Sequence, residues 1–344
     1  MRDAPADAAG PSTQDDVVSG DRERLPRVVF TSVVRSADKG ESHGGVYLID
    51  LRNGIAEQIL DWADASIDWE GRGGDRGLRG IAFHRGRVLL AASDEIFVYD
   101  RTFHILGSIR NRYLKHCHEI FVDADMLFAT STGFDSVLAY DLSAEAFVRG
   151  YCVRFGGLLR SRHVRAPLRV RPMPRLTMFD PDGADGPSPR DSAHLNNVFP
   201  QDGALYVGGM GLGNLWRISG DRISRYARIP YWNHNARPFR DGVILNWSAK
   251  DRVAFLGRNG QVRQSASVAH YDQAELENTS LPRDFARQGF ARGLTLIGED
   301  LVVGGSSPST VTLYRLDPLR ALTSVNVSKD VRNCVHGLEV WPFS

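Results

Sequence analysis

Cysteine is scarce in this chain: only Cys117, Cys152 and Cys334 occur among 344 residues. Three widely spaced thiols provide neither a disulfide framework nor a CxxC metal clip, which favours a reducing compartment. No apolar run approaches the roughly 18 residues that span a membrane. The N-terminus also lacks the basic-then-apolar pattern of a secretory leader. We therefore expect a cytoplasmic protein with no membrane partner.

An excess of one charge is also missing. The chain has 42 Lys and Arg residues against 41 Asp and Glu residues, a formal net charge of +1. This balance gives no general attraction to nucleic acid. The Gly-rich run GRGGDRG lacks the GxxxxGK[ST] pattern of a phosphate-binding loop and the helix that follows it. We expect neither a nucleic-acid partner nor a nucleotide cofactor.

Large apolar side chains are rare in residues 1–25, which are rich in Ala, Asp, Gly, Ser and Pro. Such a segment buries too little surface to offset the entropy lost on ordering, so it is predicted to be a disordered tail. The hydrophobic content of the whole chain is 42%. That content supports a large core, and residues 26–344 are predicted to form one domain.

Repeats are the strongest positive feature. Five segments share a polar residue, a short apolar stretch, a turn and an apolar run that ends in small residues. They begin at Arg79 (RGIAFHRGRVLLAAS), His118 (HEIFVDADMLFATS), His194 (HLNNVFPQDGALYVGG), His234 (HNARPFRDGVILNWS) and Arg292 (RGLTLIGEDLVVGGS). A third and usually a fourth β-rich run follows each of them. Four short strands in about 40 to 50 residues are typical of a propeller blade.

The two ends of the chain supply the sixth blade. RVVFTSVV and GGVYLIDL match the second and third strands of a blade that lacks its first strand, and HGLEVWP near the C-terminus matches a first strand with nothing after it. Pairing the two removes both exposed edges. No stretch sustains a helical period, and a β-sandwich would not explain the repeat. The sequence predicts an all-β, six-bladed β-propeller of four-stranded blades, closed by the C-terminal strand.

The repeat aligns a polar residue where each innermost strand begins. In blade order these residues are His336, Arg79, His118, His194 or Asn196, His234 and Arg292. Innermost strands line the channel of a propeller, so these side chains are predicted to converge at one end of it. Four of the ten histidines of the chain occupy this position.

A metal site is one interpretation of the four imidazoles. Histidine is the commonest ligand of transition metals, and Fe, Zn and Mn are the candidates. His118, His194, His234 and His336 are the predicted ligands. Glu119 and Glu339 are candidates for orienting the rings, although strand alternation places Glu119 on the face opposite His118.

A metal-free site is the second interpretation. Arg79 and Arg292 offer bidentate donors for an anionic substrate, and a histidine then acts as acid, base or nucleophile. Asn196, Asn235 and Trp247 are added as predicted substrate contacts. The alternative structural explanation is that polar residues at blade entrances bond a neighbouring blade, with the arginines in a channel salt bridge to Glu339.

The longest insertion covers about residues 155–192, between blades three and four. It carries Arg160, Arg162, Arg165, Arg169, Arg171 and Arg175. A long loop in a compact domain is usually functional or disordered. It is expected to overhang the channel entrance as a lid or cationic guide, or else to be a solvated excursion or a subunit contact.

Several blade motifs resemble an uncharacterised bacterial propeller family known as a domain of unknown function. The resemblance rests on HLNNV with GALYVGG, on HNARPF with VILNWS, and on FARGLTLIGEDLVVGGSS. It implies the fold but no activity. The four histidines are also similar, by analogy only, to the iron site of the seven-bladed carotenoid-cleaving oxygenases.

Three hypotheses for function follow. The first is a metal-dependent enzyme acting on a small anionic organic substrate. The second is a metal-free His/Arg transferase or lyase, and the third is a non-catalytic propeller that binds a protein or peptide. The sequence does not choose the reaction or indicate an oligomeric state.

Overall fold

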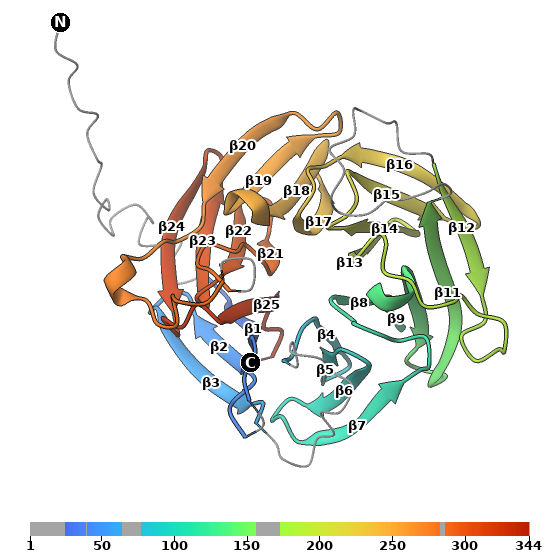
Figure 1. Cartoon of the computed structure of the whole chain (residues 1–344), viewed down its shortest axis with the longest axis horizontal. Coiled ribbons are helices and arrows are strands. Elements are labelled where there is room, and N and C mark those ends of the chain that lie inside the picture. Colours follow the sequence, from blue (N-terminus) through green and yellow to red (C-terminus); the bar gives the residue numbers. More distant parts are fainter. Residues whose placement is uncertain (1–24, 39, 64–76, 156–172, 283–285, 344) are drawn as a thin grey trace, which may run out of the picture.

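The computed structural model describes residues 25–38, 40–63, 77–155, 173–282 and 286–343. The predicted tail, except Leu25, lies outside the described residues. Six antiparallel sheets are arranged around a central axis (Figure 1). This arrangement confirms the predicted all-β, six-bladed propeller.

In blades one to three the strands follow one another from the axis outward. Blade one consists of β25 (Asn333–Val340), β1 (Arg27–Val34), β2 (Gly45–Asp50) and β3 (Ile55–Asp61). Blade two consists of β4 (Ile81–His84), β5 (Arg87–Ala92), β6 (Glu95–Asp100) and β7 (Ile105–Arg110). Blade three consists of β8 (Ile120–Asp123), β9 (Met126–Ser131), β10 (Ser136–Asp141), β11 (Ala146–Phe155) and β12 (Pro174–Phe179).

Blades four to six have four strands each. Blade four consists of β13 (Leu195–Gln201), β14 (Ala204–Gly209), β15 (Asn214–Ser219) and β16 (Arg222–Arg228). Blade five consists of β17 (Asn233–Phe239), β18 (Gly242–Trp247), β19 (Arg252–Gly257) and β20 (Val262–Ser267). Blade six consists of β21 (Leu294–Ile297), β22 (Leu301–Ser306), β23 (Thr310–Leu316) and β24 (Leu319–Asn326). Three short 3-10 helices, η1 (Thr132–Phe134), η2 (Ser248–Lys250) and η3 (Gln273–Glu275), lie in connections.

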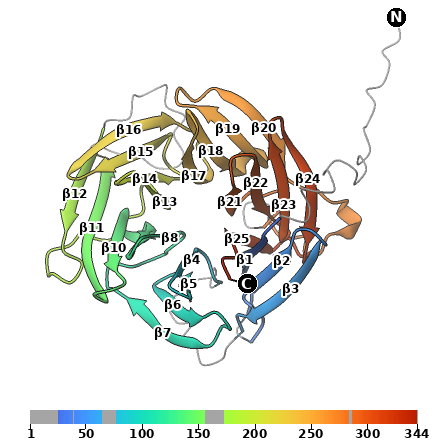
Figure 2. The same cartoon turned by 180° about the vertical axis from the view of Figure 1, so that it is seen from behind.

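The ring closes as the sequence predicts. β25, near the C-terminus, is antiparallel to β1, with Val340 opposite Val28 and Asn333 opposite Val34. Both cartoon views place β25 innermost in blade one, beside β1 (Figures 1 and 2). Beyond the strand, Trp341 packs edge-on against Phe83 of blade two, with 5.8 Å between ring centroids. The C-terminal segment therefore joins the first two blades as well as completing one of them.

Each interface between neighbouring blades contains a buried apolar cluster in the described structure. β5 shows why its sequence is a continuous apolar run. Val88 and Leu90 pack toward blade one, whereas Leu89 and Ala91 pack toward blade three. Because successive side chains of a strand point to opposite faces, a strand buried on both faces needs apolar residues at every position.

The insertion between blades three and four differs from the structureless loop predicted at residues 155–192. Part of it, β12, pairs with β11 and gives blade three a fifth, outermost strand. Arg175 lies in that strand, far out on the blade, while the other five predicted arginines lie outside the described residues. Residues 180–192 then return toward the axis. No helix in the described part of the chain is long and apolar enough to cross a membrane.

Candidate functional site at the channel entrance

The six predicted blade-entrance residues lie near one end of the innermost strands. Arg79, His118, His194 and Arg292 stand one or two residues before β4, β8, β13 and β21, while His234 and His336 lie inside β17 and β25. The ring centroid of His118 is 5.1 Å from that of His194 and 5.8 Å from that of His336. The structure therefore brings the predicted histidines and arginines together.

Glycine follows three of these polar residues because the inner strands crowd one another at the axis. A Cβ atom on Gly337 would lie 2.3 Å from the carbonyl oxygen of Arg79, and one on Gly80 would lie 2.6 Å from the amide nitrogen of Ile120. Gly293 also has a positive φ of 79°. These positions need glycine because a side chain would strike the backbone of the next blade or strain its own.

Two cavities share His118 and Arg292 in their walls. The inner cavity is about 20 Å³ in volume, space for roughly one water molecule, and also contacts His234, His336 and Asn196. The outer one, the entrance cavity, is open and about 370 Å³ in volume. Its polar lining consists of Arg35, Arg79, Arg292, His116, His118, His194 and Asp191. Among the residues that the structure describes, three guanidinium groups and the carboxylate of Asp191 thus line this cavity.

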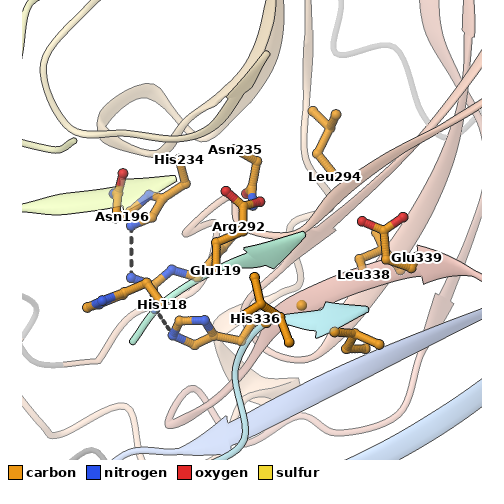
Figure 3. Close-up of a pocket in the computed structure, with 14 residues that line it drawn as sticks. His118, Glu119, Asn196, His234, Asn235, Arg292, Leu294, His336, Leu338 and Glu339 are labelled. Atoms are coloured by element: carbon orange, nitrogen blue, oxygen red, sulfur yellow. Dashed lines mark hydrogen bonds between the residues drawn. The ribbon is translucent and has the colours of Figure 1, made fainter. Parts of the chain in front are cut away.

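Arg292 lies between two of the predicted metal ligands. Its Nη2 donates to Nε2 of His234 at 2.8 Å, and its Nη1 donates to Nε2 of His336 (Figure 3). The side chain of Arg292 is buried, with 6% of the residue exposed. Both imidazoles are therefore neutral acceptors that position a cation.

A directed chain of hydrogen bonds sets the tautomer of His234. The hydroxyl of Ser248 donates to the carbonyl oxygen of Ala291 at 2.6 Å. Its oxygen, 2.6 Å from Nδ1 of His234, then accepts the proton on that nitrogen. The lone pair of His234 is left on Nε2, facing Arg292.

His118 is held in the same tautomer by different partners. Its Nδ1 lies 2.8 Å from the carbonyl oxygen of His116 and 3.0 Å from Oγ1 of Thr132. A carbonyl only accepts, so Nδ1 carries the proton and Nε2 keeps the lone pair. Burial, and then the charge of Arg79, holds the pKa of His118 well below its usual range. This imidazole is neutral at physiological pH.

The same causes act on His234 and His336. Burial, followed by the nearby charge of Arg292, holds the pKa values of His234 and His336 well below their usual range. A cluster of protonated imidazoles beside arginines is therefore disfavoured. The positive charge at the entrance comes from guanidinium groups, and the imidazoles supply lone pairs.

His194 has a carboxylate partner. Its Nδ1 lies 3.0 Å from a carboxylate oxygen of Asp191, so Nδ1 carries the proton and Nε2 is available to accept another. The carboxylate of Asp135 fixes the loop by accepting from the amides of Ser192 and Ala193, at 3.1 and 2.9 Å. The return of the insertion thus brings Asp191 to the entrance.

Apolar groups complete the lining of the entrance cavity: Met210, Trp232 and Phe290. Phe290 makes cation–π contacts with two arginines: the guanidinium carbons of Arg35 and Arg292 lie 4.9 and 5.4 Å from its ring centroid. Trp232 stands at the rim with 57% of its surface exposed. The cavity therefore combines cationic and aromatic surface.

Carboxylates line the inner cavity. Glu119 accepts from Nδ2 of Asn235 at 2.9 Å and from the amide of Val198 at 3.2 Å, and burial raises its pKa. Glu339 accepts from Oγ1 of Thr295 at 3.0 Å, and burial raises its pKa to about 7. Neither hydrogen-bond set includes the histidine rings that these carboxylates were predicted to orient. The oriented rings use His116, Thr132, Asp191 and Ser248 instead.

The remaining predicted substrate contacts lie in two different places. Asn196 and Asn235 line the inner cavity, where Asn196 donates to the carbonyl oxygen of Asn233 at 3.0 Å. Trp247 packs against the core cluster between blades four and five and lines neither cavity. Arg292, one of the two arginines predicted to pair with Glu339, contacts two histidines, and Glu339 accepts from Thr295.

The donor set does not fit the predicted four-histidine metal centre. Two of the four Nε2 lone pairs accept from Arg292, which places a cation where the metal ion would lie. The partner of His194 is a separate carboxylate. Across the described ranges, no three His, Cys, Asp or Glu side chains are grouped so as to hold a metal ion. The prediction of Fe, Zn or Mn finds no support in this geometry.

The residues of the entrance cavity that were not singled out from the sequence include Arg35, His116, Asp191, Trp232 and Phe290. They lie in connections, outside the repeated positions, so the blade alignment does not reveal them. Asp191 had one signal, since it stands three residues before His194 and four before the start of the inner strand β13. His116 had a similar one, two residues before His118.

Comparisons with known proteins support the fold. One chain of a nidogen/laminin complex has a TM-score of 0.56 and 11% identity, covering 91% of this chain and 97% of that one. A protein of unknown function from Bacteroides caccae has a TM-score of 0.51 and 8% identity, covering 91% and 98%. At these identities the likeness shows the propeller fold alone.

Sequence comparison gives little more. No family model matches the chain. The isonitrile lipopeptide synthase of Mycobacterium tuberculosis (strain ATCC 25618 / H37Rv) is 39% identical over 57 residues. That stretch is 16% of this chain and only 2% of the synthase. The resemblance to an uncharacterised propeller family therefore stays a prediction.

Proposed function

We propose that this protein is a metal-independent lyase or transferase that binds a small organic anion in the entrance cavity. The observation that carries the proposal is the contact of Arg292 with Nε2 of both His234 and His336. Because those acceptors are neutral, Arg292 remains a cation in these two contacts. Its guanidinium group can also donate to a carboxylate, sulfate or phosphate group of a ligand.

His194 is the proposed acid-base group. Asp191 orients its ring, as the carboxylate orients the histidine in hydrolase triads. In an elimination, Nε2 takes a proton from the carbon beside the anionic group. The electron pair of that C–H bond forms the new C=C bond, and the leaving group departs with the electrons of its own bond. His194 then returns the proton to the leaving group.

The test separates binding from proton transfer. Binding of acetate, sulfate and phosphate would be measured by calorimetry on protein dialysed against a chelator. Turnover would be followed by ¹H NMR in D₂O with a panel of 3-hydroxy, 3-acyloxy and 3-sulfooxy carboxylic acids. His194→Gln should abolish deuterium uptake and product formation while anion affinity stays within a few fold. Asp191→Asn should slow turnover, and its anion affinity should also stay within a few fold of wild type.

Two results would overturn the proposal. One is the failure of every anion to bind the wild-type chain. The other is activity that chelation removes and one transition metal restores, which would favour the metal-dependent enzyme instead. A matched control is His104→Gln, because His104 lies on the outer hairpin of blade two with its side chain 81% exposed.

A further inference from the structure

Trp232 combines two features that folding alone does not explain. It is a large aromatic residue with 57% of its surface exposed. Its φ angle is +59°, in the left-handed region. A bulky residue there is a strained outlier, and such strain is concentrated at binding and catalytic sites.

The surrounding structure holds this conformation in place. The amide of Trp232 donates to the carbonyl oxygen of Met210 at 3.0 Å, and its own carbonyl oxygen accepts from the amide of Ala249 at 3.4 Å. Nδ2 of Asn233 braces the same turn by donating to the carbonyl oxygen of Pro230 at 2.7 Å. The backbone is fixed from three sides, while the indole is left in contact with water and with the entrance cavity.

The other wall of the cavity is cationic. Arg79 and Arg292 are buried at 2% and 6% exposure, and Arg35 lies over Phe290. An inorganic anion or a short acid could contact these cations and would make no use of Trp232 or Met210. The volume of about 370 Å³ suits a ligand with an organic body as well as a charged end.

We infer that the natural ligand is an amphiphilic organic anion, with its charged group at Arg79 and Arg292 and an aromatic or bulky aliphatic group against Trp232 and Met210. Trp232 is then a specificity-determining residue. This inference rests on the proposed function, because it assumes that the entrance cavity binds an anion. It adds the class of ligand that the cavity selects.

The experiment compares acetate, phenylacetate and cyclohexylacetate by calorimetry on the full chain. Phenylacetate and cyclohexylacetate should bind at least about tenfold more tightly than acetate, as expected for burying a ring. Trp232→Ala should remove most of that advantage and leave acetate affinity unchanged. Trp232→Phe should restore most of it for phenylacetate.

Tyr231→Ala is the matched control, since Tyr231 is the adjacent aromatic residue, 47% exposed, and does not line the cavity. It should leave all three affinities unchanged. Equal binding of the three acids by wild type, or equal losses in the Trp232→Ala and Tyr231→Ala variants, would overturn this inference and leave the anion site standing. Binding of none of them, nor of sulfate or phosphate, would instead overturn the proposed function.

Discussion

The entrance and the interior of the channel are built from the same six inner strands, yet their linings differ. The entrance cavity gathers guanidinium groups and imidazoles around open space. The inner cavity adds Glu119 and Glu339, which accept hydrogen bonds from Asn235, Val198 and Thr295. Polar groups in the interior mainly hold blades together. Those at the entrance have room beside them for a ligand.

Position along the inner strand decides this difference. A residue just before the strand is beside the connections, which diverge from the axis and leave a cavity. The residue that follows Arg79 or His336 is close to the backbone of another blade, as the close approaches at Gly80 and Gly337 show. Changing one charge in each region tests whether the entrance and the interior differ in ligand binding.

Removal of the entrance cation should have the largest effect. Arg292→Met should weaken phenylacetate binding about 100-fold, because a buried charge-assisted contact is lost. It should also raise the pKa values of His234 and His336 toward their usual range, since the Arg292 charge contributes to lowering them. Calorimetry and NMR titration of the imidazoles check the two outcomes.

The interior control is Arg237→Met. Arg237 is buried and donates to the carbonyl oxygen of Leu294, and it does not line the entrance cavity. Its loss should reduce stability while the surviving folded protein binds phenylacetate within a few fold of wild type. Equal losses of affinity in both variants would remove the distinction between the two regions.

Replacing the interior carboxylate of Glu339 by an amide should stabilise the protein at high pH. The pKa of Glu339 is about 7, raised from 4.5. Folded Glu339 therefore keeps its proton over a range where the unfolded chain has lost it, so stability falls as pH rises from about 4.5 to 7. Glu339→Gln should add at most about 3 kcal/mol above pH 7 and nothing near pH 4.5.

Urea unfolding at pH 4.5, 6 and 8 measures this difference. Glu57→Gln is the matched control, because Glu57 is exposed on β3, and it should show no such pH dependence. A Glu339→Gln variant whose gain is the same at every pH would contradict the assignment of the pH effect to this carboxyl group.

The buried imidazoles should produce the opposite slope. Their pKa values lie well below 6.5 in the folded protein, so the unfolded chain takes up protons that the folded chain does not. Stability should fall as pH drops below about 6.5, by roughly 1 kcal/mol per pH unit for each histidine. Measured in Glu339→Gln, where the opposing effect of Glu339 is absent and that of Glu119 is the same in both variants, the slope should flatten when His336→Gln is added. An unchanged slope would contradict the assignment of this pH dependence to His336.

The sequence predicts the propeller well because a blade is a local unit that repeats. Closure is also predictable, since the incomplete first blade and the isolated final HGLEVWP strand need each other. The blade alignment even places Arg79, His118 and Arg292 correctly at one end of the channel. All of these inferences use only the order of residues within a repeat.

The electrostatic arrangement of the site was not predictable in this way. Nothing in the order of residues shows that Arg292 of blade six inserts between His234 of blade five and His336 of blade one. The metal prediction treated four imidazoles as equivalent because they share a repeat position. Asp191 and Trp232 come from connections that differ between blades, and they are identified only by long-range contacts.

The hydroxyl of Ser248 offers the smallest and most specific test of the entrance. Ser248 does not line the entrance cavity, but its hydroxyl accepts the Nδ1 proton of His234 and so keeps the lone pair of that ring facing Arg292. Ser248→Ala should cost about 1 kcal/mol of stability, typical of one buried hydrogen bond, and weaken phenylacetate binding about fivefold. Ser248→Thr should restore binding, and Ser143→Ala, at an exposed turn of blade three, should change neither property. A loss of stability with unchanged affinity would show that Ser248 supports the blade and does not position Arg292.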